Sequence, residues 1–348
     1  MTLTELSYYS RRFLPLGIIS FLVLLIFFYA FQLLFIYLGG QQKQTVVLDP
    51  TFGAIKRLQV ETIQNKPSTF VLDTIEGRPI SSTESAKIFY IPPTTTRFGY
   101  RQKVQAMATA MGFNTETLDY TIVNEKDAKY TDVTGQALID ITNYNFSYSY
   151  NIKNNPSIFD NASLPDDEQV TNQATTYLKT LGVYPEEFAQ GKTNIIYLHY
   201  DSNADTITTV NTAQGANMVE VDFYRPDVEG VPIVPPRYFN SQNYVTLVFR
   251  GLDFTVVKSQ VKYFKKSNEV IGTYPLKTGN QAWEELNQGK GLVVSMSEPT
   301  DTIKIAKMFV AYVDPDIYQE YLQPVYVFLG DHNFVGYIPA VDNSYLRE

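Results

Sequence analysis

The longest uninterrupted run of apolar residues begins at Phe13 and ends at Leu38. It exceeds the roughly 20 residues that an α-helix needs to cross a bilayer, and Gln32 is one of its few clearly polar members. A cleavable signal peptide has an apolar region of about 7–15 residues and a small-residue cleavage site, which the segment after Leu38 does not resemble. The run therefore predicts an uncut transmembrane helix over 13–38, with Phe13, Gly17, Gln32 and Leu38 as anchor residues.

Charges on the two sides of this run predict its orientation. Arg11 and Arg12 directly precede it, whereas Lys43 is the one cation close to its other end. Because the cytoplasmic flanks of membrane spans carry an excess of Lys and Arg, we expect residues 1–12 to form a cytoplasmic tail. The rest of the chain then lies outside the cytoplasm, on a plasma-membrane protein with a single span.

The range 39–84 contains short β-like pieces that proline and glycine interrupt. Asp49-Pro50 and Lys66-Pro67 are two such interruptions. Proline and glycine at this density mark turns and loops rather than regular elements. We expect this range to form a partly ordered juxtamembrane stalk.

Three later segments have apolar residues at the spacing of an amphipathic helix. Each segment ends at a glycine, the residue that often follows a helix, namely Gly112, Gly182 and Gly289. Ser163 precedes the second segment at a position typical of an N-cap. The apolar positions are Val104, Met107, Ala108 and Met111 in the first segment, Val170, Ala174, Tyr177, Leu178 and Leu181 in the second, and Ala282, Trp283 and Leu286 in the third.

Strands follow each predicted helix. In 144–150, aromatic residues alternate with small polar residues, which is typical of a sheet with one buried face and one wet face. The ranges 218–223 and 245–249 alternate apolar and polar residues in a similar way. Later candidate strands are 303–312, 325–329 and 334–338.

Meandering strands beside isolated helices predict an α+β fold. We expect the transmembrane helix to be followed by two or three antiparallel-sheet units, each with one packed helix. Turn-rich segments place these units at 85–155, 156–255 and 256–348. In the last unit, Trp283 and Leu286 are expected to bury against a sheet. That sheet is expected to be built from Val325, Val327, Phe334 and Tyr337.

Composition narrows the class of protein. The chain has no cysteine, which excludes disulfides, thiolate metal sites and cysteine nucleophiles, and favours a bacterial envelope over a eukaryotic secretory setting. The formal net charge is −8, and removing the +1 of residues 1–12 leaves −9 for the remainder. A surface with this charge argues against a nucleic-acid partner.

Motifs that carry chemistry are scarce. His199 and His332 are far apart and lack the neighbours of a zinc site, and the loop that begins at Asp201 lacks the glycine and glutamate of a calcium loop. The sequence contains neither a nucleophile elbow nor a phosphate-binding loop. We therefore predict no catalytic residue, no metal and no cofactor. A hydrolase stays open as a third hypothesis, which requires a cleft with two convergent carboxylates.

One local concentration of positive charge stands out. Lys258, Lys262, Lys265 and Lys266 fall within nine residues of one another. Such a patch could meet anionic lipid or wall polymers, and it is our candidate interaction patch. Lysines that protect an edge strand from aggregation explain the same pattern.

The last eighty or so residues resemble the end of the YycI and YycH accessory proteins. The resemblance is carried by a Val-Ile-Gly-Thr-Tyr-Pro-Leu strand that ends at Leu276, the helix 279–289 with Trp283, the strand 303–312, and the Leu-Gln-Pro-Val-Tyr-Val segment that begins at Leu322. Members of that family are single-pass membrane proteins whose extracytoplasmic domains regulate an essential sensor kinase. The resemblance implies a similar topology and a regulatory role, and it transfers no functional residue.

Together these features predict a non-enzymatic, membrane-anchored extracytoplasmic protein of the cell envelope. We expect it to bind another membrane protein, either a sensor kinase or an assembly component, and to contact the lipid bilayer through its N-terminal helix. Gly17 and Gln32 are residues of the kind that pack or hydrogen-bond against a partner helix. The alternative is a module that binds an envelope polymer or attaches to a surface, for which the lysine patch is the motivating feature.

Overall fold

The structure is a computed structural model, and it describes residues 18–35, 47–64, 67–80, 84–251 and 253–348. The chain divides into two compact units, Met1–Val47 and Leu48–Glu348. In the first unit, the helix Ile18–Phe35 is long and apolar enough to cross a membrane, as a membrane anchor or a signal sequence does.

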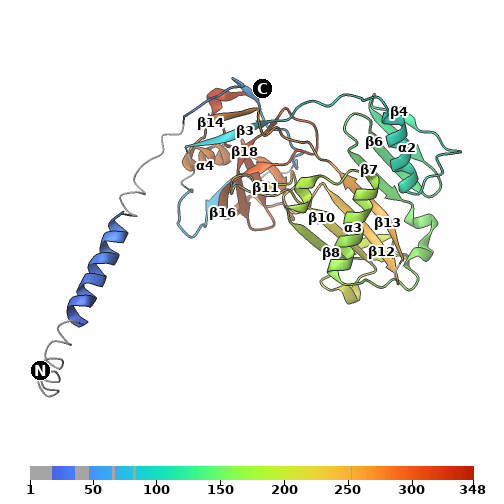
Figure 1. Cartoon of the computed structure of the whole chain (residues 1–348), viewed down its shortest axis with the longest axis horizontal. Coiled ribbons are helices and arrows are strands. Elements are labelled where there is room, and N and C mark those ends of the chain that lie inside the picture. Colours follow the sequence, from blue (N-terminus) through green and yellow to red (C-terminus); the bar gives the residue numbers. More distant parts are fainter. Residues whose placement is uncertain (1–17, 36–46, 65–66, 81–83, 252) are drawn as a thin grey trace, which may run out of the picture. The chain divides into compact units, whose positions relative to one another are not determined.

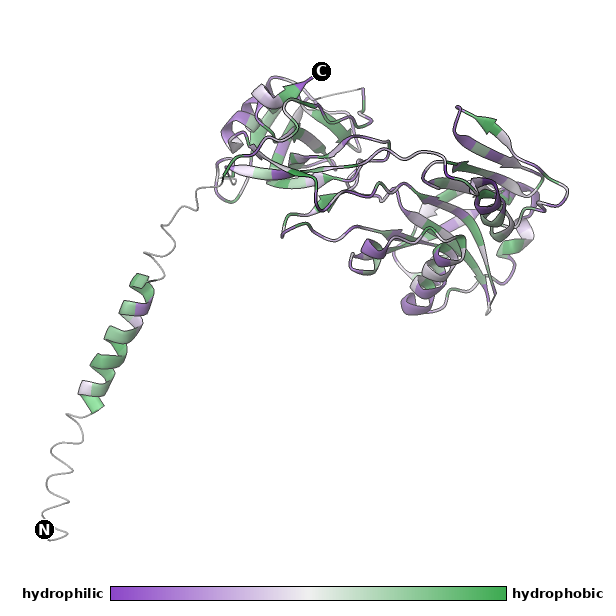
Figure 2. Ribbon diagram, turned by 45° about the horizontal axis from the view of Figure 1, so that its top comes forward, coloured by the Kyte–Doolittle hydropathy of each residue, from purple (hydrophilic) through white to green (hydrophobic). Residues whose placement is uncertain are grey.

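Figure 2 shows this helix almost entirely in the colour of hydrophobic residues. Of the predicted anchor residues, Gln32 lies in the helix, and Phe13, Gly17 and Leu38 lie outside the described residues.

The larger unit contains a nine-stranded sheet in which all neighbouring strands are antiparallel (Figure 1). Its strands come from residues 121–261. Their order across the sheet is β4 (Thr121–Val123), β5 (Asp127–Thr131), β6 (Gly135–Asp140), β7 (Phe146–Tyr150), β13 (Asp253–Val261), β12 (Tyr244–Arg250), β10 (Met218–Phe223), β8 (Thr193–Asp201) and β9 (Thr206–Thr209).

Two helices, α2 (Tyr100–Ala110) and α3 (Asp167–Leu181), cover one face of this sheet (Figure 1). Their apolar stripes bury in one core with the inward side chains of the strands, as the periodicity predicts. The Lys103 ammonium of α2 donates to the carbonyl of Leu181 at 2.6 Å, so it satisfies a backbone group that the end of α3 leaves free. We refer to this side of the sheet as the helix face.

The N-cap predicted for α3 is wrong by three residues. Asp166, rather than Ser163, caps the helix, and its side chain accepts from the amide of Gln169 at 2.8 Å. A carboxylate at this place also interacts favourably with the helix dipole. The helix ends at Gly182, which has a φ of 64° and so adopts a conformation that glycine takes without strain.

The opposite side of the nine-stranded sheet, which we call the open face, has no α-helix on it within the described residues. At one end, short 3₁₀ turns place Ile158 against Met218, Val248 and Val257 of the sheet. At the other end, the side chains of the same strands are polar. The open face is therefore divided between an apolar, covered half and a polar half.

A second group of sheets is built from both ends of the larger unit. Four of the pairings are parallel or short, so this region is less regular than the nine-stranded sheet. The first sheet has the order β11 (Ile233–Val234), β16 (Thr302–Val313), β18 (Pro324–Gly330), β19 (Val335–Pro339) and β15 (Leu292–Ser295), with β2 (Thr69–Leu72) paired to β16. The second sheet has the order β14 (Ile271–Pro275), β3 (Ser85–Tyr90) and β17 (Tyr321–Leu322). The third is the pair of β1 (Ile55–Lys56) and β20 (Leu346–Arg347).

Part of the range predicted as a stalk belongs to these sheets instead. Ile55 is fully buried in β1, which pairs in parallel with the C-terminal strand, and Phe70 is buried in β2. The strands also divide the chain differently from the predicted ranges 85–155, 156–255 and 256–348. β3 pairs with β14, and β7 pairs with β13, so each pairing joins strands that lie far apart in the sequence.

The third predicted helix is α4 (Gly279–Asn287), and Thr278 and Gln281 form a capping box at its start. Its predicted packing partners are wrong in part. Leu286 shares a core with Phe328, Phe334 and Ile338, and Trp283 is half-buried with its ring centroid 6.2 Å from that of Phe328. Val325, Val327 and Tyr337 belong to a different core.

The difference arises because both faces of β18 and β19 are buried, so alternation of apolar residues does not say which face meets the helix. Mostly antiparallel sheets with a few packed helices make the chain an α+β protein, and this prediction is confirmed.

Candidate functional site

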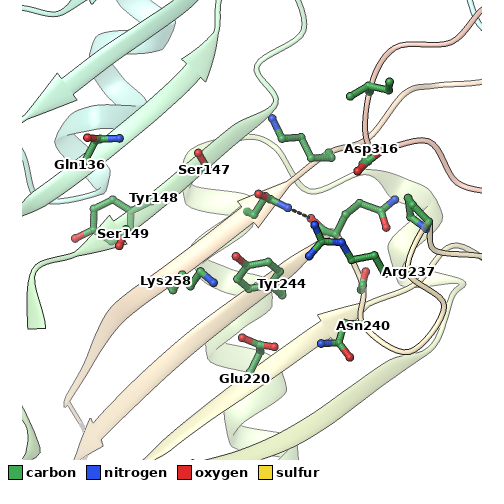
Figure 3. A pocket seen from close by; sticks show the side chains of 16 residues that line it. Gln136, Ser147, Tyr148, Ser149, Glu220, Arg237, Asn240, Tyr244, Lys258 and Asp316 are labelled. Atoms are coloured by element: carbon green, nitrogen blue, oxygen red, sulfur yellow. Dashed lines mark hydrogen bonds between the residues drawn. The ribbon is translucent and has the colours of Figure 1, made fainter. Parts of the chain in front are cut away.

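The polar half of the open face forms a cleft of about 640 Å³ (Figure 3). Its floor consists of side chains from five neighbouring strands. Along each strand, these side chains alternate with the apolar side chains of the helix face. Residues of two loops, 236–242 after β11 and 316–317 after β16, complete its border. The floor residues are Gln136 from β6, Ser147 and Ser149 from β7, Lys258 and Gln260 from β13, Tyr244 from β12 and Glu220 from β10.

A β-bulge sets the boundary between the apolar and polar halves of the open face. The register between β12 and β13 shifts between Thr246 and Leu247. The extra residue in β13 places Val257 and Lys258 consecutively on the open face, with Val257 in the covered core and Lys258 in the cleft. The bulge thereby presents Lys258, Gln260 and the following Lys262 along one line of the cleft.

A buried ionic network fixes the border of the cleft. Arg225 donates through Nε to Glu187 at 2.8 Å and through Nη1 to Asp314 at 3.0 Å, and all of its side chain is buried. Gln242, which borders the cleft, donates to the second oxygen of Asp314 at 2.6 Å. Gln260 in turn donates to the backbone carbonyl of Gln242 at 3.0 Å. The chain of bonds holds the loop over the sheet.

The electrostatics of this network follow from burial. Burial raises the pKa of the Asp314 carboxyl, and the neighbouring Arg225 guanidinium opposes that effect. Arg225 also lies over the ring of Tyr263, 4.9 Å from its centroid. A buried ion pair with good geometry costs about 3–5 kcal/mol when one partner is removed, so the network is a structural support of the site.

Asp222 lies on the same side of β10 as Glu220, beneath the bordering loop. It is fully buried, and its Oδ2 accepts from the Tyr224 hydroxyl at 3.1 Å and from the Ser241 amide at 3.5 Å. Its Oδ1 has no hydrogen-bond partner within the described residues. Burial, reinforced by the charge of Glu220, raises the pKa of Asp222 to about 7.

The four lysines of the predicted patch are not equivalent. Lys258 and Lys262 line the cleft, and the Lys258 ammonium lies 5.2 Å from the centre of the Tyr244 ring. Lys265 is exposed and does not line the cleft. Lys266 lies over the Phe89 ring and donates to Asn268 at 2.6 Å, and burial lowers its pKa.

The explanation by edge-strand protection is wrong for Lys258, the patch lysine that lies on β13. Lys262, Lys265 and Lys266 follow the end of that strand. β13 is a central strand that pairs with β7 on one side and β12 on the other, so it has no edge to protect.

The cleft also contains carboxylates. Glu220 and Asp316 both line it, and Figure 3 shows them on opposite sides with Arg237 and Tyr244 between them. Asp222 is buried under the loop. Glu220 also accepts from the Thr246 hydroxyl at 2.8 Å.

In the described part of the chain, no three His, Asp or Glu side chains form a group that could hold a metal ion. His332 lies 3.6 Å from the Glu298 carboxylate, and His199 is exposed on β8. The Asp201 side chain accepts from the amides of Asn203 and Ala204 in a turn, which is the structure expected of a loop of this kind.

Sequence reasoning found two of the residues in this cleft, Lys258 and Lys262, and missed most of the others. Polar side chains such as Gln136 and Gln260 occur in strands, where they are expected on a wet face. The alternation of 144–150 and 218–223 did place Ser147, Ser149 and Glu220 on one side of their strands. Which strands are neighbours could not be read from the sequence, and the cleft depends on that.

Comparisons with known proteins add little. No protein-family model matches the chain, and no curated protein matches it. Two solved structures are similar over most of their length. An uncharacterised protein from Eubacterium rectale ATCC 33656 has 12% identity and a TM-score of 0.38, over 74% of this chain and 84% of that chain. The C-terminal domain of Bacillus megaterium YpeB has 14% identity and a TM-score of 0.27, over 73% of this chain and 96% of that chain. Likenesses at these TM-scores decide neither the fold nor the function.

Proposed function

We propose that this protein is a membrane-anchored binding protein of the cell envelope, without catalytic activity, that holds another envelope protein in the open-face cleft. The helix Ile18–Phe35 supplies the anchor, and the larger unit lies outside the cytoplasm. A membrane sensor kinase is one such partner, which the resemblance of the C-terminal residues to YycI and YycH implies.

The observation that carries the proposal is the uncovered polar half of a sheet whose other face packs against α2 and α3. Five neighbouring strands direct polar side chains to one cleft, and a buried network of Arg225, Asp314 and Gln242 holds its border in place. A site with rigid walls loses less conformational entropy when it binds a partner.

A second candidate is a module that binds an envelope polymer. Two observations favour it, namely the position of Lys258 and Lys262 in the cleft and the central position of β13, the strand that carries Lys258. Anionic wall polymers present repeated negative charges that lysines attract. The same cleft would serve, with a different occupant.

The test is site-specific photo-crosslinking in the native membrane. A photo-reactive amino acid replaces Asn240 or Gln136, two exposed residues that line the cleft, in the full-length protein. The control carries it at His199, an exposed residue of β8 that does not line the cleft. We expect the two cleft positions, and not the control, to crosslink the same envelope protein, identified by mass spectrometry.

Dependence on the anchor is tested with the same cleft variant and a scrambled helix at residues 18–35. Loss of the crosslink indicates that the helix brings the cleft to a membrane partner. Equal crosslinking at His199 and at the cleft positions contradicts the proposed site. Wall polymer as the sole crosslinked species moves the function to the second candidate.

A further inference from the structure

The charged side chains of the cleft differ in whether they have partners of opposite charge. Arg237 forms an ion pair with Glu61, so its charge is compensated. For Lys258 and Lys262, no carboxylate lies at ion-pair distance among the residues that the structure describes. The cleft therefore contains two ammonium groups without a carboxylate partner. Glu220 and Asp316 also line it, so an anionic ligand is matched along the Lys258–Lys262 line and not over the whole cleft.

The spacing of these two lysines constrains the shape of the ligand. Lys258 and Gln260 lie on β13, which ends at Val261, and Lys262 directly follows that strand, so the two lysines are four residues apart and all three side chains line the cleft. Four residues of extended chain span about 13 Å. An extended peptide also repeats its side chains on one face every second residue, so acidic residues four apart in it match the lysines.

The other side chains of the cleft suit a peptide backbone. Gln136, Asn240 and Ser149 are exposed in the cleft, and their amide and hydroxyl groups both donate and accept hydrogen bonds. A peptide presents N–H donors and C=O acceptors in equal number, whereas a phosphodiester chain presents charged acceptors. Two tyrosines line the cleft, and neither is a free platform for a sugar: the ring of Tyr244 carries the Lys258 ammonium, and Tyr148 is buried.

From this charge and spacing we propose that the open-face cleft binds an extended acidic peptide segment of a protein partner, with Lys258 and Lys262 each pairing with one of two carboxylates four residues apart. This inference rests on the proposed function, because it names the chemistry of the ligand for the same site. The backbone of the floor strands is already paired on both sides, so the segment lies across their side chains and adds no strand to the sheet.

The experiment measures binding of short labelled peptides to the full-length protein in nanodiscs of neutral lipid, by fluorescence anisotropy. The probe is an unstructured peptide with two glutamates four residues apart, and the matched peptide has glutamines in their place. Two exposed ion pairs support an expected difference of about tenfold in Kd between the peptides. Binding of the acidic peptide weakens as salt increases, because salt screens the pairs.

Variants connect this difference to the cleft. The double variant Lys258→Gln with Lys262→Gln is expected to bind the acidic peptide about tenfold more weakly and to bind both peptides equally. Lys265→Gln is the matched control, since Lys265 is an exposed lysine of the same segment outside the cleft, and it is expected to leave binding unchanged. Circular dichroism of each variant checks that the fold is retained.

Several results would overturn the inference. One is equal binding of the two peptides by the unmodified protein, and another is an equal loss in Lys265→Gln. Lysine-dependent binding of poly(glycerol phosphate) without binding of the acidic peptide also overturns it, in favour of the polymer. Suppose that neither ligand binds while the photo-reactive residue at position 240 still crosslinks an envelope protein. In that case the inference of an acidic peptide ligand is wrong and the proposed function stands. Loss of that crosslink is the failure of the proposed function itself.

Discussion

The two faces of the nine-stranded sheet are made by the same strands and have opposite roles. On the helix face, side chains such as Val219, Val221 and Phe223 are fully buried against α2 and α3. On the open face, the residues between them, Glu220 and Asp222, lie at or beneath a polar cleft. Burial of the apolar face supplies the stability of the fold. The open face is thereby left for binding, and substitutions should separate the two roles.

The largest effect is expected on the helix face. Phe223→Ala removes a fully buried ring that stacks on Phe188, with the centroids 5.8 Å apart, and that meets Tyr184 edge to face. We expect a loss of about 3–5 kcal/mol in the free energy of unfolding, because the truncation leaves a cavity in a packed core. Urea unfolding of the full-length protein in detergent, followed by circular dichroism, measures it.

The matched control for this prediction is Tyr244→Ala, on the neighbouring strand and on the open face. It removes a ring of similar size from a half-buried position, so a smaller loss is expected. If Tyr244→Ala costs as much as Phe223→Ala, the open face contributes to stability as the helix face does, and the distinction between them fails.

Burial of Asp222, on the open face, opposes folding at neutral pH. Its pKa is raised from 3.8 to about 7, so the folded state holds a proton that the unfolded state releases. The stability of the protein therefore falls as pH rises from about 4 to 7, and the cost is fully present above pH 7. Asp222→Asn removes the ionisable group, so the variant should be more stable than the unmodified protein at pH 8, by at most about 4 kcal/mol.

The sign of this difference is checked by urea unfolding at pH 8 and at pH 4. Most of the gain should be lost at pH 4, where the carboxyl is protonated in the folded state and about two-fifths protonated in the unfolded state, whose pKa is 3.8. Glu220→Gln is the companion variant, since the Glu220 charge contributes to the raised pKa of Asp222. A gain that is the same at both values of pH would show that Asp222 is not held neutral by burial.

Local features of the fold could be predicted from the sequence, since they depend on residues close together along the chain. The apolar stripes of α2 and α3 and their terminal glycines are of this kind, and the structure confirms them. The alternation in β10 also sorted Val221 and Glu220 to opposite faces correctly. Capping was less certain, because Ser163 and Asp166 are both good N-cap residues and lie one turn apart.

Features that depend on distant pairing could not be predicted. Nothing local distinguishes β13 as a central strand from β13 as an edge strand, and the lysines on it and just after it suggested the wrong alternative. The bulge beside Thr246 is a property of two strands together, so the sequence of one does not reveal that Val257 and Lys258 share a face. The short strands β1 and β2 are stabilised by partners more than two hundred residues away.

A smaller effect is expected at the link between the two helices of the helix face. Lys103→Met keeps the aliphatic stem and removes the ammonium that donates to the carbonyl of Leu181. We expect a loss of about 1 kcal/mol, from one charged hydrogen bond at a helix C-terminus. Gln102→Met, at the neighbouring exposed position of α2, is the control and should change the free energy of unfolding by less. Equal effects would mean that the ammonium does not cap α3.

The smallest change in stability is expected at Lys258, a lysine that we propose to bind the acidic peptide. Lys258→Gln removes a cleft ammonium whose folded-state contact is the ring of Tyr244, 5.2 Å away. The cation–π contact is partly exposed, and substitutions at the surface usually have small effects on stability. We therefore expect a change within about 0.5 kcal/mol in the free energy of unfolding. Urea unfolding of this variant beside Phe223→Ala tests the separation of the two faces directly. A loss of several kcal/mol in Lys258→Gln would mean that the lysine supports the fold, and its position in the cleft would then be no argument for a ligand.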